Sequence, residues 1–135
     1  MAMPVALAIL LAGCSGAMEG FSFGKAPKEA PADPTLYPKD YRPEIAAFMR
    51  RYLENPTQVR DASIAEPVMR PVGSTQQYIT CVRYNPRDGS NRYQGTTTRV
   101  ALFLSGRLNQ FIPDDQKLCD GLNYQRYPEI ESLTP

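Results

Sequence analysis

The chain has 135 residues, a length that allows one small domain with appendages but not two full cores. Fifteen Lys and Arg residues against fourteen Asp and Glu give a formal net charge of +1, so the broad positive field of nucleic-acid-binding proteins is missing. The absence of histidine and the count of three cysteines exclude a histidine general base and a four-ligand Cys/His zinc site. We therefore expect no nucleic-acid partner, no metal and no cofactor.

The first thirteen residues are uncharged and strongly apolar. They read MAMPVALAILLAG, which is shorter than the ~20 residues of a membrane-spanning helix. A short buried core helix is the alternative, but Pro4 and the Gly/Ser-rich residues that follow suit such a helix poorly. An apolar stretch of this length that ends in small residues is typical of an export signal. We assign residues 1–13 to a signal peptide.

The end of this stretch carries a short motif. Leu11, Ala12, Gly13 and Cys14 resemble the lipobox of bacterial lipoproteins. The resemblance implies diacylglycerol on the Cys14 sulfur, cleavage before Cys14 and acylation of the new amine, and Ser15 implies sorting to the outer membrane. The layout is also similar to that of small envelope lipoproteins of alphaproteobacteria. Because several acyl chains anchor stably, we expect a periplasm-facing domain held on the outer membrane through Cys14.

Prolines recur at intervals of three or four residues in the segment that follows. Pro27, Pro31, Pro34 and Pro38 restrict the backbone and remove amide donors, which favours an extended chain over a helix or a paired strand. We assign residues 14–40 to the lipidated cysteine and a Pro-rich tether. A Pro-rich docking peptide for a partner is the alternative.

An amphipathic helix opens the predicted domain. Apolar residues occur at i, i+3, i+4, i+7 and i+8 between Ile45 and Leu53. Pro43 suits the first helical position, and the pair Asn55 and Pro56 ends the pattern. The apolar stripe of this helix is expected to pack against a sheet.

Alternating apolar residues and turn formers predict strands after the helix. We expect an irregular edge strand within residues 62–72 and regular strands at 76–84, 93–104 and 107–112. The simplest arrangement is an α+β fold, with one N-terminal amphipathic helix packed on a three- to four-stranded antiparallel meander sheet. This domain is predicted to occupy residues 41–130, with a loose C-terminal end at 131–135.

Two cysteines remain once Cys14 is assigned to the lipid. In an oxidising periplasm, Cys81 and Cys119 are expected to form a disulfide. A redox-active pair is the alternative, but these cysteines lack the CxxC spacing that lowers a thiol pKa.

Arginines gather in the predicted hairpins, where Asp88 is the only acid. Arg and Tyr are common at binding interfaces, and Arg pairs well with carboxylate and phosphate groups. We therefore predict a binding surface, and a solvated sheet face is the alternative. The predicted surface consists of Arg83, Tyr84, Arg87, Arg92, Tyr93, Arg99 and Arg107.

No catalytic residue can be assigned, because the Ser and Thr hydroxyls have no histidine to activate them. The first hypothesis is a non-catalytic structural or interaction module whose partner is an envelope protein, an anionic lipid or the cell wall. The second is an inhibitor that presents residues 85–91 to a cell-wall-degrading enzyme. The third is a carboxylate-dependent hydrolase.

Overall fold

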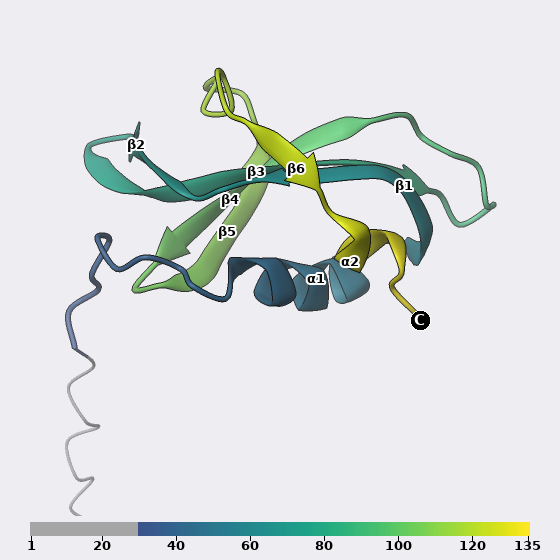
Figure 1. The fold of residues 1–135 in the computed structure, drawn as a ribbon, viewed down its shortest axis with the longest axis horizontal. Coiled ribbons are helices and arrows are strands. Elements are labelled where there is room, and N and C mark those ends of the chain that lie inside the picture. The colour runs from purple at the N-terminus through teal and green to yellow at the C-terminus, as the bar shows by residue number, and fades with distance from the viewer. Residues whose placement is uncertain (1–29) are drawn as a thin grey trace, which may run out of the picture. The chain divides into compact units, whose positions relative to one another are not determined.

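The structure is a computed structural model that describes residues 30–135 (Figure 1). The predicted signal peptide, Cys14 and residues 15–29 of the predicted tether lie outside the described residues. The described chain forms an α+β domain with two helices and a six-stranded antiparallel sheet. Neither of these helices is long and apolar enough to cross a membrane. In chain order the elements are α1 (Tyr41–Tyr52), β1 (Asn55–Ala65), β2 (Val68–Val72), β3 (Thr75–Arg87), β4 (Thr97–Leu104), β5 (Arg107–Pro113), β6 (Tyr124–Arg126) and α2 (Pro128–Glu131).

The sheet has more strands than the sequence predicts. Its order is β5-β4-β3-β1-β6, and β2 pairs with the first part of β3. β3, β4 and β5 form the predicted antiparallel meander. The predicted count of three or four strands is wrong, because the single edge strand expected within residues 62–72 is two strands, β1 and β2, and β6 pairs with β1.

Backbone irregularities explain why the sequence pattern does not reveal β1. Its register with β3 shifts between Asn55 and Arg60 and again between Arg60 and Ser63. Gln58 and Asp61 have φ values of 54° and 52°, as residues in β-bulges do. Each irregularity interrupts the alternation of side chains, so no period of two marks residues 55–61. β6 has three residues and is too short to show a period.

α1 is the predicted amphipathic helix, but it opens the domain and not the chain, since 40 residues precede it. Ile45 and Met49 are fully buried, and Phe48 and Leu53 pack at the edge of the same core. The sequence pattern does not predict α2, which has four residues. Leu133, just beyond α2, is 8% exposed and belongs to the core, although the sequence assigns it to a loose end.

The sheet buries apolar side chains on both faces. The helix face packs against α1 and α2 and holds the larger core, which includes Phe103 and Tyr127. We call the opposite face the disulfide face. Residues 114–122, the disulfide segment, lie against it and help form a smaller core with Ile79 and Val100. In Figure 1 the helices lie below the sheet and the loop that contains the disulfide segment lies above it.

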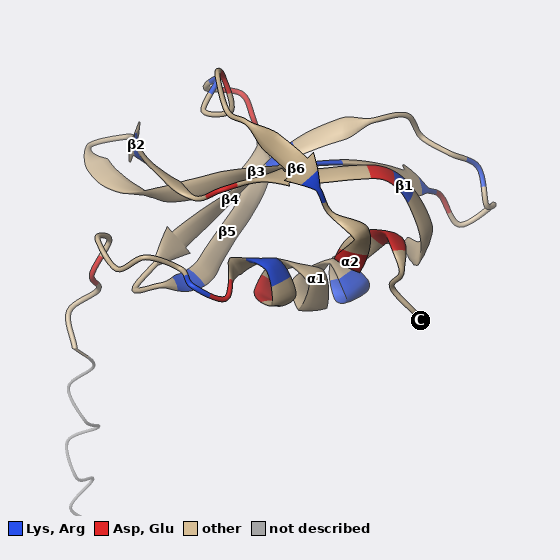
Figure 2. Ribbon diagram, in the orientation of Figure 1, with Lys and Arg blue, Asp and Glu red and all other residues tan. Residues whose placement is uncertain are grey.

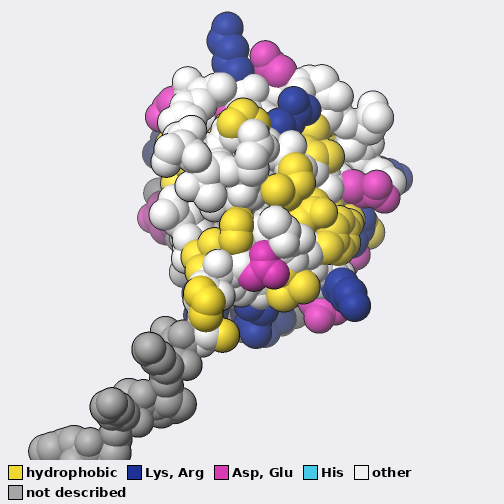
Figure 3. All heavy atoms as spheres, turned by 90° about the vertical axis from the view of Figure 1, so that its left-hand side faces the viewer, with side chains coloured by type: hydrophobic (Ala, Val, Ile, Leu, Met, Phe, Trp, Pro, Cys, Tyr) yellow, Lys and Arg dark blue, Asp and Glu magenta, His cyan; other side chains and the backbone are white. Residues whose placement is uncertain are grey.

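The compact part of the chain begins at Pro31, within the predicted tether. Asp33 and Ser105 hold this segment on the β4–β5 turn: the Asp33 N–H donates to Ser105 Oγ at 2.8 Å, and the Ser105 N–H donates to the Asp33 carbonyl at 2.9 Å. Pro38 is buried, whereas Leu36 is 50% exposed. Figure 3 views the molecule from this end and shows patches of hydrophobic side chains across the middle and lower part of this face, among polar side chains and backbone.

Candidate functional site

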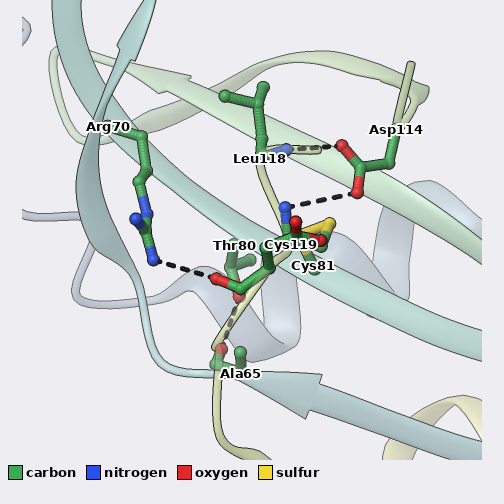
Figure 4. The surroundings of a disulfide bond; sticks show 8 residues. Ala65, Arg70, Thr80, Cys81, Asp114, Leu118 and Cys119 are labelled. Carbon is green, nitrogen blue, oxygen red and sulfur yellow. Dashed lines mark hydrogen bonds between the residues drawn. A yellow bond between two sulfur atoms is a disulfide. The ribbon is translucent and has the colours of Figure 1, made fainter. Parts of the chain in front are cut away.

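Cys81 and Cys119 form a disulfide, as the sequence predicts (Figure 4). Their Cα atoms are 5.9 Å apart, within the usual range for this bond. Cys81 is fully buried on β3, and Cys119 is 6% exposed in the disulfide segment. The bond therefore ties the segment that follows β5 to the central strand of the sheet.

Hydrogen bonds also hold the disulfide segment in place. Asp114 accepts the backbone N–H groups of Leu118 at 2.7 Å and Cys119 at 3.2 Å. The guanidinium of Arg70 on β2 donates to the carbonyl of Asp120 at 3.2 Å (Figure 4). Both carboxylate oxygens of Asp114 therefore accept hydrogen bonds from backbone N–H groups. Within residues 30–135, no three His, Cys, Asp or Glu side chains are grouped as a metal site requires.

The seven residues of the predicted binding surface do not form one patch. Arg107 lies at the β4–β5 turn and its Nε is 2.8 Å from Glu44, a hydrogen bond that raises the pKa of Arg107. Arg92 lies in the β3–β4 loop with its Nε 3.5 Å from Asp88. Both arginines are exposed and matched by an acid, so neither adds to a net positive surface.

Tyr84, Arg87 and Arg99 come together in a groove of about 690 Å³ at the C-terminal end of α1. We call it the helix-end groove. β3 and β4 contribute its lining together with residues 52–54 and the β3–β4 loop. Arg87 Nη2 donates to the hydroxyl of Thr57 at 2.8 Å. Tyr84 is 2% exposed, and burial raises the pKa of its phenol although the charge of Arg99 acts in the opposite direction.

Arg83 and Tyr93 lie elsewhere, and each takes part in a cation–π pair. The Arg83 guanidinium carbon is 3.7 Å from the ring centroid of Tyr124 on β6, and that of Arg60 on β1 is 4.1 Å from the ring centroid of Tyr93. Among residues 30–135, no acid lies within ion-pair distance of either arginine. Stacking on a tyrosine positions a guanidinium without neutralising its charge.

Strand pairing brings a third arginine to the same face. Ser63 on β1 lies opposite both Arg83 and Arg126, and Asn85, two residues after Arg83, lies opposite Arg60. Directly paired residues share a face of a sheet, so all three arginines are on the disulfide face. We call Arg60, Arg83 and Arg126 the arginine patch, and all three are exposed. Figure 2 shows basic residues on β6 and on the strands beside it.

The sequence pattern does not predict three residues of this arrangement, namely Arg60, Tyr124 and Arg126. Arg60 lies between the two register shifts of β1, and the other two lie in a three-residue strand. The only available signal is the spacing of Tyr124 and Arg126, which alternate around Gln125. That signal does not reveal that β6 pairs with β1.

No family model, curated protein or solved structure matches this chain. Its function must therefore be inferred from its own residues.

Proposed function

We propose that this protein is a non-catalytic, acyl-anchored lipoprotein of the outer membrane whose periplasmic domain binds anionic lipid headgroups through the arginine patch. The observation that carries the proposal is the arginine patch itself: Arg60, Arg83 and Arg126 are exposed on one sheet face, and none of them pairs with an acid of residues 30–135. In this proposal the lipobox-like residues that end at Cys14 provide the anchor, and Ser15 directs the protein to the outer membrane.

The cysteines support an oxidising compartment. Disulfides persist in the periplasm and are rare in the bacterial cytosol. The bond between Cys81 and Cys119 uses two of the three cysteines. Cys14 is therefore the one cysteine left for acylation, which agrees with its position directly after the apolar segment.

The strength of the arginine patch suits a domain that is already at a membrane. Each arginine near an anionic surface contributes roughly 1 kcal/mol, so three arginines contribute roughly 3 kcal/mol, on the order of a hundredfold in partitioning. This is weak for recruitment from solution. Acyl chains at Cys14 would already hold the domain at the membrane. The contact between the arginine patch and the headgroups would then be intramolecular, so a weak contact is sufficient.

Cell fractionation tests the anchor. Cys14→Ser removes the sulfur that would carry diacylglycerol, and we expect the protein to leave the outer-membrane fraction. Ser15→Asp keeps the sulfur, and we expect this variant to stay in the membrane fraction but to move from the outer to the inner membrane. A Cys14→Ser protein that still sediments with outer membranes would contradict the proposed anchor.

Vesicle sedimentation tests the arginine patch. The Cys14→Ser chain without the apolar residues 1–13 is expected to bind vesicles that contain phosphatidylglycerol and not vesicles of phosphatidylcholine alone. One variant replaces the three patch arginines by glutamine, and a control with the same loss of charge replaces three exposed basic residues near or on α1: Lys39, Arg50 and Arg51. We expect the patch variant to bind about a hundredfold more weakly and the control to keep most of its affinity.

Two outcomes of the vesicle experiment would contradict the role of the patch. An equal loss in both variants would show that net charge alone drives binding. No binding of the parent chain to anionic vesicles would refute the lipid partner and favour an envelope protein or the cell wall.

A further inference from the structure

The helix-end groove holds two arginines whose charges are not matched. The Nε atoms of Arg87 and Arg99 are buried and have no hydrogen-bond partner, and neither guanidinium pairs with an acid of residues 30–135. Thr57 accepts two hydrogen bonds from Arg87 Nη2, whereas the phenol of Tyr84 is the group near the charge of Arg99. A buried donor without an acceptor is costly, so such groups usually face an ion, a water or a ligand.

Two acids, Asp88 and Glu54, line the groove, and they differ in whether the carboxylate is free to bind a ligand. Asp88 accepts two backbone N–H groups of its own loop and the side-chain amide of Gln94, and these bonds lower the pKa of its carboxyl. The Asp88 carboxylate is therefore already occupied by hydrogen bonds within the β3–β4 loop. Glu54 is exposed and forms no ion pair within residues 30–135. Its Oε1 lies 2.6 Å from where a Cβ of Gly89 would be, so the missing side chain of Gly89 leaves room for this carboxylate.

We propose that the helix-end groove binds a short peptide with free ends, and that Arg99 holds its carboxylate while Glu54 meets its ammonium group. Because the Asp88 carboxylate is occupied within its own loop, the groove presents two guanidiniums and one free carboxylate to a ligand. These groups match a ligand that carries both a negative and a positive charge. The negative charge of Glu54 would repel a ligand that carries several phosphates. This inference goes beyond the proposed function, since neither Cys14 nor the arginine patch takes part.

The size and walls of the groove fit this ligand. A volume of about 690 Å³ lies within the range of small-molecule sites. Tyr52, at the end of α1, is 43% exposed. Its ring stacks on Phe48 with ring centroids 5.1 Å apart and contacts Phe111 edge to face at 5.2 Å, which fixes the ring at the edge of the groove. The peptide could come from a protein or from the cell wall, because both supply a free carboxylate and an amino group.

Titration of the isotopically labelled Cys14→Ser chain by NMR tests the proposal. The probes are the dipeptide L-Ala-L-Ala, its D-Ala-D-Ala counterpart, the C-terminal amide and the N-acetylated form. Ligands of this size bind with Kd values of roughly 1 mM, and we expect shifts confined to the groove. The C-terminal amide should bind at least about tenfold more weakly than the free dipeptide, because it has no carboxylate to form the charge-assisted pair with Arg99. Preference between the L and D dipeptides then indicates the source of the natural ligand.

Variants assign the two roles. Arg99→Gln should weaken binding of the free dipeptide about tenfold or more. Glu54→Gln lies at an exposed position and should abolish the advantage of the free dipeptide over the N-acetylated form. Arg107→Gln is the control, since Arg107 pairs with Glu44 outside the groove. This variant should bind the free dipeptide as tightly as the parent chain does. Dispersed amide resonances and an intact disulfide show that each variant is folded.

Three results would overturn the proposal. The first is the absence of shifts at Tyr84 and Thr97 with either dipeptide at concentrations well above the expected Kd. The second is equal binding of the dipeptide and its amide. The third is tighter binding of inorganic phosphate than of the dipeptide, which would make the groove a phosphate site. None of these results bears on the vesicle experiment, so the two proposals fail separately.

Discussion

The disulfide between Cys81 and Cys119 constrains the unfolded chain strongly. The two cysteines are separated by 38 positions. For a loop of about 40 residues, the chain-entropy relation gives about 4 kcal/mol of stabilisation. Single domains have a free energy of unfolding of about 5–15 kcal/mol, so reduction should remove a large share of it. Because 1 kcal/mol shifts the Tm of a domain of about 100 residues by roughly 4–8 °C, we expect reduction to lower Tm by roughly 15–30 °C.

Unfolding of the oxidised and reduced protein measures this effect without removing any atom from the core. The Cys14→Ser chain is unfolded with urea and by heat, with and without a thiol-free reductant. The double variant Cys81→Ala, Cys119→Ala is the control, and the reductant should not change its midpoint. A difference below about 1 kcal/mol between the oxidised and reduced forms would refute the assignment of about 4 kcal/mol to loop closure.

Three further substitutions test the packing of the domain. Tyr127→Phe removes a buried hydroxyl that donates to the carbonyl of Arg42, and urea titration should show a loss of about 1–2 kcal/mol; no loss would contradict the role of this bond. The hydrogen bond from Arg42 lowers the pKa of Glu129, so the stability that this carboxylate provides is present above its unfolded pKa and is lost as the pH falls through its folded pKa. Glu129→Gln should therefore reduce the acid dependence of the free energy of unfolding, and an unchanged pH profile would speak against the pair. Gly106→Ala places a Cβ 3.2 Å from Leu36 Cδ2 at a φ of 73°, and the urea midpoint should fall by the equivalent of about 1 kcal/mol or more; a rise would show that the turn relaxes freely.

The parts of the fold that the sequence predicts are those with a regular apolar period. In β4, Val100 and Leu102 alternate with Ala101 and Phe103, and both sets are buried because both faces of the sheet are covered. β1 cannot be predicted in the same way, since positive φ values at residues 58 and 61 break its alternation. β6 and α2 have three and four residues, and their conformation depends on pairing and packing with β1.

The predicted binding residues separate because neighbours in sequence alternate between sheet faces. Arg83 lies on the disulfide face with Cys81, whereas Arg99 lies opposite Val82 on the helix face. Arg126 joins Arg83 only through strand pairing, which a single sequence does not show. The disulfide is predictable because it depends on the cysteine count and on the compartment, and no knowledge of the register is needed.

Acylation at Cys14 is the claim on which the membrane, the compartment and the role of the arginine patch depend. Mass spectrometry of the protein purified from its native membranes measures it directly. We expect a chain that begins at Cys14, carries a diacylglyceryl group on the sulfur and an acyl group on the amine, and retains the bond between Cys81 and Cys119. A native chain that begins at Met1 with an unmodified thiol at position 14 would contradict the proposed function.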